Sequence, residues 1–256
     1  MSEASQPPSE NTTEHCSDLA AYLRILHEPG DVFEVRILDC PDRPGGSWKS
    51  TAAGWFMDAA KAVREAERIE KLEPPAVYVS LNPVNPVLMG RSMNRISPKA
   101  KATSKDENIL RRRWLFIDID AVRPAGISST DAELAEAVKL SDAIQSAMVA
   151  DGWPEPLVGM SGNGRYLLWR IDLPNDTDSD KLIERALKAL AQRFDTDGAE
   201  VDCSTFNASR ICKLLGTMVR KGDELRDVPG VDDRPHRRSW FIAPSNPLQV
   251  VSAEQL

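Results

Sequence analysis

Hydrophobic residues recur along this chain with two different periods, and these periods predict its strands and helices. Every second residue is apolar in a half-buried strand, whereas an amphipathic helix repeats its apolar residues every three or four positions. By this criterion helices are predicted over residues 14–28, 58–72, 130–150 and 178–194. Strands are predicted over residues 32–38, 76–81, 113–120, 157–160, 165–173, 200–202 and 239–243, the last as an edge strand.

The order of these elements favours one α+β (mixed α/β) domain over residues 14–247, because strands and helices follow one another without a clear linker. Residues 1–13 are polar and rich in proline and serine, which predicts a disordered tail rather than a signal peptide. Residues 248–256 are expected to form a short C-terminal tail. No apolar run approaches the length of a membrane span, so no membrane association is expected.

Two acidic residues end the most regular predicted strand, residues 113–120. Residues two apart in a strand share a face, so Asp118 and Asp120 project the same way, with Trp114 and Phe116 behind them. Adjacent carboxylates repel each other unless a cation lies between them, and paired oxygen ligands suit Mg²⁺ or Mn²⁺ better than zinc. On the spacing alone, an ordinary pair of strand-end or turn residues that face water is the more common interpretation.

A glycine-rich turn, Ser161-Gly162-Asn163-Gly164, separates two later apolar runs. Asn-Gly between apolar runs is a strong hairpin signal, and a tight turn is the simplest interpretation. The alternative is that the glycines let backbone N–H groups approach a phosphate. No Gly-Lys-Ser/Thr follows, which excludes a P-loop, and the following strand excludes a dinucleotide-binding fingerprint.

Basic residues gather in local stretches, although the net charge of −7 argues against a general nucleic-acid-coating surface. A solvated face is one interpretation of such a stretch, and contact with nucleic-acid phosphates is the other. Arg210 and Lys213 are expected to share a face of a helical turn and to hold phosphate. Ser104 and Glu107 have the spacing of a helix capping box, and so do Thr130 and Glu133 at the start of the predicted helix over residues 130–150. The stretch before the central strand contains Arg91, Arg95, Lys99, Lys101, Lys105, Arg111, Arg112 and Arg113, and Lys221 lies in a later one.

The four cysteines, Cys16, Cys40, Cys203 and Cys212, are widely spaced and form no Cys-x-x-Cys pair. Together with the lack of a signal peptide, this spacing predicts reduced thiols and a cytoplasmic chain. The content of charged residues (28%) and hydrophobic residues (41%) is ordinary for a globular protein.

The order of these motifs resembles that of the archaeo-eukaryotic primase superfamily, and most closely the primase-polymerase-like proteins of phages, plasmids and bacterial mobile elements. The shared order is a strand ending in two aspartates (residues 116–120), a Ser-Gly-x-Gly hairpin (residues 161–164) and the pair Val201-Asp202. No single motif is specific, but their order and spacing together are a much stronger signal. Further matching stretches are residues 81–86, 122–127, 161–175, 207–217, 220–223 and 233–238, so the resemblance spans about residues 31–243.

The resemblance implies an RRM-like catalytic sheet, antiparallel or mixed, with flanking helices over about residues 91–247, packed against an N-terminal αβ unit of about residues 14–90. It implies that Asp118, Asp120 and Asp202 are catalytic and hold two Mg²⁺ or Mn²⁺ ions. Such ions activate a 3′-hydroxyl and neutralise a leaving pyrophosphate. The implied nucleotide-binding residues are Ser161, Gly162, Asn163, Gly164, Arg165, Tyr166, Arg210 and Lys213, and the expected nucleic-acid-binding residues are Arg91, Arg95, Lys99, Lys101 and Lys221.

The expected activity is that of a metal-dependent nucleotidyltransferase, a DNA primase or polymerase that uses nucleoside triphosphates on a single-stranded or primed DNA template. Such an enzyme would serve replication of a mobile element or repair, with a helicase or replication protein on a separate chain, since no helicase motif is present. One position departs from the family: its motif histidine, which contacts the phosphate of the incoming nucleotide, is replaced by Tyr166, which carries no positive charge near neutral pH. Two alternatives are a non-catalytic nucleic-acid-binding module of the same fold and a metal-dependent nuclease or phosphodiesterase.

Overall fold

The computed structural model describes residues 15–244 and 246–256, which form two main antiparallel sheets flanked by helices. The predicted tail over residues 1–13 lies outside the described residues. The six-stranded sheet contains, in order across it, β1 (His15–Cys16), β12 (Trp240–Ile242), β6 (Leu157–Met160), β7 (Gly164–Leu173), β5 (Arg112–Ala121) and β8 (Ala199–Val201). The four-stranded sheet contains β3 (Lys49–Phe56), β2 (Phe33–Pro41), β4 (Tyr78–Ser80) and β9 (Ile211–Lys213).

A short antiparallel pair, β10 (Met218–Val219) and β11 (Arg237–Arg238), stands apart from the two sheets. The α-helices of the described residues are α1 (Leu19–Leu26), α2 (Ala59–Glu70), α3 (Asp131–Ala150) and α4 (Thr177–Phe194). Two short 3₁₀ helices, η1 (Pro86–Gly90) and η2 (Asp106–Asn108), complete the elements. The predicted mixed α+β class is therefore confirmed.

Local side-chain chemistry fixes where the helices begin. Asp18, Asp58 and Asp176 each accept backbone N–H groups of the first turn of α1, α2 and α4. The capping box predicted from Thr130 and Glu133 forms at the start of α3. No helix in the described part of the chain has the length and apolar character needed to cross a membrane.

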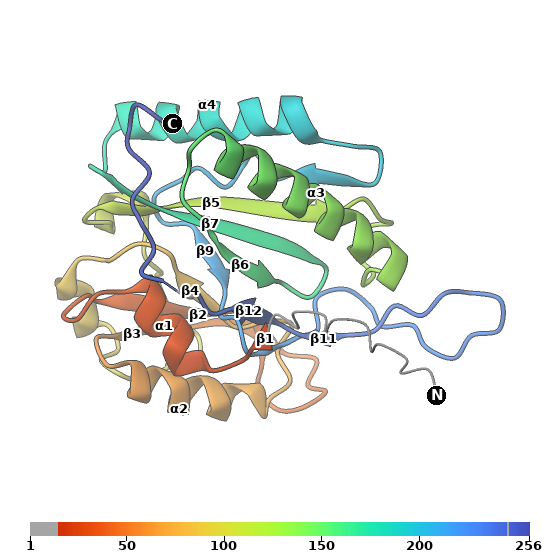
Figure 1. The fold of residues 1–256 in the computed structure, drawn as a ribbon. Coiled ribbons are helices and arrows are strands. Elements are labelled where there is room, and N and C mark those ends of the chain that lie inside the picture. The colour runs from red at the N-terminus through yellow and green to blue at the C-terminus, as the bar shows by residue number, and fades with distance from the viewer. Residues whose placement is uncertain (1–14, 245) are drawn as a thin grey trace, which may run out of the picture.

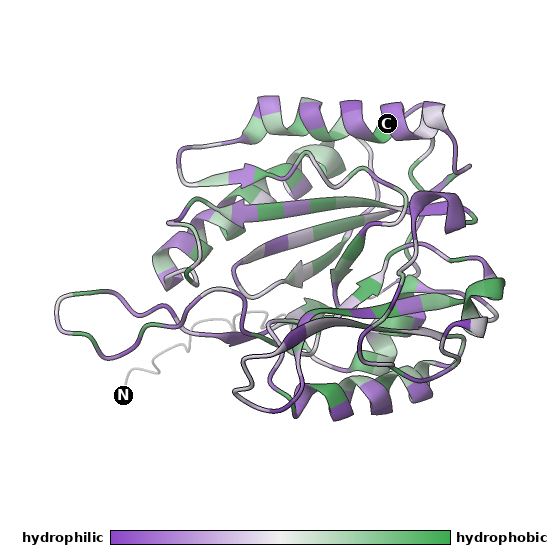
Figure 2. Cartoon of the chain, turned by 180° about the vertical axis from the view of Figure 1, so that it is seen from behind, coloured by the Kyte–Doolittle hydropathy of each residue, from purple (hydrophilic) through white to green (hydrophobic). Residues whose placement is uncertain are grey.

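The six-stranded sheet lies between two layers (Figure 1). Helices α3 and α4 cover one of its faces, and the four-stranded sheet with α1 and α2 lies on the other side. Strand β5 shows why both faces are covered: Leu115, Ile117 and Ile119 pack toward α3 and α4, while Trp114 and Phe116 join the core between the sheets. The outermost helices, α2 and α4, alternate hydrophilic and hydrophobic residues, as expected for one solvated face (Figure 2).

Two strand predictions differ from the structure. Strand β3 was not expected, because its first half is built from small and hydroxyl residues that give no apolar alternation. Residues 239–243 do contain a strand, but the prediction of an edge strand is wrong. Strand β12 lies inside the sheet, since β1 pairs with its outer side and β6 with its inner side.

Two predictions of local helical structure are also wrong. Residues 211–213 form strand β9 instead of a helical turn, because they pair with β4 of the four-stranded sheet. Ser104 caps no helix: its Oγ accepts a hydrogen bond from Trp55 Nε1 at 3.0 Å, and η2 begins only at Asp106. In both cases a partner distant in sequence decides the local conformation.

Candidate functional site

The three predicted acids come from two neighbouring strands. Asp118 and Asp120 lie near the end of β5, and Asp202 directly follows β8. The Asp202 backbone N–H donates to the Asp118 carbonyl oxygen at 2.8 Å, one step beyond the pairing of Ile119 with Val201. Directly opposed residues of an antiparallel pair project from the same face. The fold therefore brings all three acids to the face of the six-stranded sheet that meets the four-stranded sheet.

Asp118 is the most perturbed of the three acids. Its side chain is half-buried, and its Oδ1 atom is fully covered with no hydrogen-bond partner among the described residues. Burial and then the nearby charge of Asp120 raise the pKa of Asp118 to about 7, with Asp202 adding to the rise and Lys213 and Lys221 opposing it. A covered carboxylate oxygen without a partner is a feature that a bound cation would satisfy.

The other two carboxylates are engaged by the chain itself. Asp202 Oδ1 accepts the backbone N–H of Ser204 at 2.8 Å, and Asp120 Oδ1 lies 3.8 Å from an Arg123 guanidinium nitrogen. Consequently no three acidic, histidine or cysteine side chains of the described residues converge as a ready set of metal ligands. Asp118 and Asp120 nevertheless share one face of β5, and both Asp120 and Asp202 are close enough to Asp118 to raise its pKa.

Positively charged side chains approach the acids from three separate segments. Lys213, from β9, is buried, and its Nζ lies 5.7 Å from the centre of the Tyr166 ring. Burial lowers the pKa of Lys213, while the charge of Asp118 raises it. Lys221 is exposed and lies close enough to Asp118 to lower its pKa. Arg123 was not predicted; it follows β5, and its guanidinium lies 3.8 Å from Asp120 Oδ1.

The predicted hairpin forms between β6 and β7, beside the acids, since Gly164 is paired with Asp120. A β-carbon at Gly164 would lie 2.2 Å from the Ile119 carbonyl oxygen, so this position requires glycine. Asn163 is buried, and its Oδ1 accepts hydrogen bonds from the Ser129 N–H and hydroxyl at 2.9 and 3.1 Å. The Asn163 side chain therefore fixes the hairpin to the start of α3.

The two other hairpin residues also lie in enclosed positions. Ser161 is fully buried, and its hydroxyl has no partner among the described residues. Gly162 has a φ of +98°, which favours glycine, and Val219 packs against it. The hairpin thus supports the edge of the acidic site mainly through its backbone.

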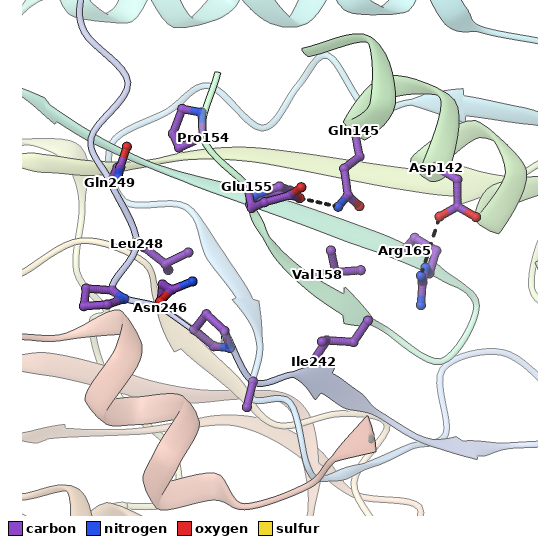
Figure 3. A pocket seen from close by; sticks show the side chains of 14 residues that line it. Asp142, Gln145, Pro154, Glu155, Val158, Arg165, Ile242, Asn246, Leu248 and Gln249 are labelled. Atoms are coloured by element: carbon purple, nitrogen blue, oxygen red, sulfur yellow. Dashed lines mark hydrogen bonds and ion pairs between the residues drawn. The ribbon is translucent and has the colours of Figure 1, made fainter. Parts of the chain in front are cut away.

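Tyr166 and Arg165 are neighbours in β7 and therefore project from opposite faces of the sheet. Tyr166 lies opposite Asp118, is buried, and meets the Phe116 ring edge-on at 4.7 Å. Its hydroxyl accepts the backbone N–H of Lys213 at 3.5 Å, so this side chain forms the floor of the acidic site. Arg165 is not brought to the acids: it lies across the sheet, 4.0 Å from Asp142 of α3 (Figure 3).

The remaining predicted residues fall into two groups. Arg210 hydrogen-bonds the carbonyl and hydroxyl oxygens of Ser204, so it holds the turn that follows Asp202. Arg91, Arg95, Lys99 and Lys101 are exposed on the segment beside β3, at the edge of the four-stranded sheet opposite β9. Three strand spacings separate that edge from β9, which is about 14 Å.

Tyr78 also lies at the acidic site, although it was not among the predicted residues. It pairs with Lys213 across β4 and β9, and burial followed by the charge of Asp118 and that of Asp39 raises its pKa to about 12. No sequence signal points to this residue, because its role depends on which strand pairs with β4.

Comparisons with known proteins give structural neighbours alone. No protein-family model and no curated protein sequence matches the chain. One similar solved structure is that of the primase RepB′, with a TM-score of 0.45 and 12% identity over 92% of this chain and 58% of that chain. Another is the AEP domain of the cyanophage S-2L primase-polymerase, with a TM-score of 0.47 and 16% identity over 94% of this chain and 96% of that domain. This chain therefore spans little more than half the length of the RepB′ structure, and both neighbours are primases, the class that the motif order resembles.

Proposed function

We propose that this chain is a primase-type nucleotidyltransferase whose active site is built on Asp118 and Asp120. The observation that carries this proposal is the covered Oδ1 of Asp118, which has no hydrogen-bond partner in the described part of the chain and lies beside a second carboxylate. Full ionisation of such a pair at neutral pH is favoured by a cation between its members. Charged side chains of the opposite sign surround it, which is the arrangement that a metal-bound triphosphate needs.

The proposal assigns metal binding to the acidic residues and triphosphate binding to the basic residues around them. Asp118 and Asp120 would hold a divalent ion, and Asp202 would join them by turning its carboxylate away from the backbone of the following turn. When bound, Mg²⁺ or Mn²⁺ supplies the charge that activates an attacking hydroxyl and offsets the leaving pyrophosphate. Lys213 and Lys221 would bind the triphosphate, since they already lie within electrostatic range of Asp118.

The exposed basic segment beside β3 is the proposed contact for single-stranded DNA. Lys99 Nζ lies 4.3 Å from the centre of the Trp48 ring, and the Arg91 guanidinium lies 5.5 Å from that of Trp55. Trp48 is 47% exposed, so its ring offers a surface on which a base can stack beside a phosphate-binding lysine. Stacking combined with cationic contacts is how proteins hold single strands without reading sequence.

The face of the four-stranded sheet connects this basic segment with the acids. Ala53, Arg36, Tyr78 and Lys213 are directly opposed across β3, β2, β4 and β9, so they form one row on one face. Two members of this row, Ala53 and Lys213, are buried, and Arg36 donates a hydrogen bond to the Ser104 carbonyl oxygen at 3.1 Å. The chain therefore covers part of the row, and the basic segment and the acids are linked through the sheet rather than by an open groove.

A primer-extension and priming assay tests the proposal. Wild type, Asp118→Asn and the matched exposed variant Asp232→Asn are incubated with Mn²⁺, a single-stranded template, with and without primer, and either ribo- or deoxynucleotides. We expect template-dependent product from wild type and Asp232→Asn, and a loss of about 100-fold or more in Asp118→Asn. Absence of product from wild type under every condition would refute the proposal, and cleavage of DNA without nucleotides would instead indicate a nuclease.

Two observations favour a second candidate, a non-catalytic nucleic-acid-binding module. The three acids do not converge as a ready metal site, and Tyr166 is buried where the family carries a phosphate-contacting histidine. This candidate predicts that single-stranded DNA binding persists when Asp118, Asp120 and Asp202 are all replaced by asparagine, in a chain that makes no product. Single-stranded DNA binding that weakens with salt to the same extent in wild type and in the triple variant would support this candidate.

A further inference from the structure

A cavity of about 610 Å³ opens on the side of the six-stranded sheet that faces away from the acids (Figure 3). It lies between α3, β6 and the segment after β12, and its volume is in the range of small-molecule sites. Its lining is mixed, and prolines with the side chains of Val158, Ile242 and Leu248 supply the apolar part. Asp142 and Glu155 stand among its polar lining residues.

Arg165 brings a positive charge into this cavity (Figure 3). Its side chain is 8% exposed, and no group of the described residues accepts a hydrogen bond from it, the Nε atom being fully covered. Its ion pair with Asp142 spans 4.0 Å, and the Asp142 side chain is 63% exposed, so this pair is weak. A guanidinium has five N–H donors, and leaving them unpaired in a buried position is unfavourable.

The surroundings of Arg165 show which ligand atoms would satisfy it. Trp240 lies against the guanidinium, with the ring centre 5.0 Å from the central carbon. Contact of this kind occupies the flat side of a guanidinium, whereas its N–H groups point outward in the plane. A carboxylate matches that planar fork with two parallel hydrogen bonds.

We propose that this cavity is a binding site for a small organic carboxylate with an apolar body. The carboxylate would pair with Arg165, and the body would pack against Val158, Ile242 and the proline walls. A singly charged group is favoured over a phosphate because Asp142 and Glu155 already place two negative charges around one cation. The site lies on the opposite face of β7 from Tyr166, so the proposal is independent of the activity proposed for the acids.

Benzoate is a suitable probe, with benzyl alcohol and phenyl phosphate as analogues that keep the ring and change the head group. The full chain is titrated with each probe, and the indole N–H signal of Trp240 is followed by NMR. We expect a saturable shift with benzoate and affinities at least about tenfold weaker for the uncharged and the phosphorylated analogue. No saturable shift with benzoate, an equal response to benzyl alcohol, or tighter binding of phenyl phosphate would overturn the proposal.

Variants locate the site. Arg165→Gln should weaken benzoate binding by about tenfold or more. The control Arg193→Gln should leave it unchanged: Arg193 pairs with an aspartate and stacks on Phe194 in the same way, but on the surface of α4. Asp142→Asn removes a negative charge from the lining and should tighten benzoate binding, which tests the proposal even if Arg165→Gln does not fold. Unchanged binding in Arg165→Gln, or weaker binding in Asp142→Asn, would contradict it.

Discussion

The carboxyl group of Asp118 should make the stability of this chain fall as pH rises, in the metal-free state. Its pKa is about 7 in the folded chain, against an ordinary value of 3.8. Between these values the folded chain keeps a proton that the unfolded chain has lost, so unfolding releases a proton and is favoured by raising the pH. Ionisation of Asp118 therefore leaves the free energy of unfolding unchanged below pH 3.8, and it lowers that free energy most above pH 7.

The size of the effect follows from the difference between the two pKa values. A difference of about 3 units corresponds to about 4 kcal/mol in the free energy of unfolding. Because the side chain retains some exposed surface, solvent screening reduces the expected effect to about 2–4 kcal/mol. Replacement by asparagine keeps the shape and removes the titration, so Asp118→Asn should be more stable than wild type by this amount above pH 7 and equal to it near pH 4.

Urea unfolding at a series of pH values in a chelator measures this difference. Wild type, Asp118→Asn and the exposed control Asp232→Asn are compared from about pH 4.5 to about pH 8.5. The difference in the free energy of unfolding between Asp118→Asn and wild type should grow with rising pH. Adding Mn²⁺ at the highest pH of the series should stabilise wild type and reduce this difference. Parallel stability curves for wild type and Asp118→Asn would show that the carboxyl is not perturbed and would refute the reasoning.

Three other substitutions test how the site is held together. Gly164→Ala forces a β-carbon against the Ile119 carbonyl and should destabilise the chain by about 2–3 kcal/mol in urea unfolding; a change below about 0.5 kcal/mol would contradict this close approach. Asn163→Ala removes the 3.0 Å hydrogen bond to the Lys221 carbonyl and should cost about 1–3 kcal/mol in the same assay, and an unaffected midpoint would count against it. Asp202→Asn keeps an acceptor for its turn, so stability should change by less than about 0.5 kcal/mol, while Mn²⁺ affinity measured by calorimetry should fall about tenfold. Equal Mn²⁺ affinity in wild type and Asp202→Asn would remove Asp202 from the proposed ligands.

Local sequence patterns predicted the parts of the fold that depend on local physics. The alternation in β5 indicated that Asp118 and Asp120 share one face and that the intervening isoleucines face the other, and the structure has this arrangement. The capping box at Thr130 and the Asn-Gly hairpin between β6 and β7 also form as predicted. In each case the deciding residues lie within a few positions of one another.

What could not be predicted depends on pairing between distant strands. Lys213 was expected on a helical turn, yet β9 joins β4, and this pairing places Lys213 beside the acids together with Tyr78. Strand β3 escaped prediction because Ala52 and Ala53 gain their burial from the sheet rather than from their own hydrophobicity. Lys213 and Lys221 were named from the sequence as binding residues, but the fold decides that they lie beside the acids.

Side chains alternate between the two faces of the six-stranded sheet, and this alternation decides which basic residues can lie beside the acids. Arg165 follows the hairpin directly and was expected near the nucleotide, but its neighbour Tyr166 occupies the face that bears Asp118. Moving Arg165 to that face would require a one-residue slip of β7, which would also turn Leu167 and Trp169 out of the core beneath α3 and α4. Burial of these apolar side chains holds the register, so positive charge must reach the acids from other segments, as Lys213 and Lys221 do. Strand β7 thus separates two regions of different charge, the three acids on one face and the buried Arg165, weakly paired with Asp142, on the other.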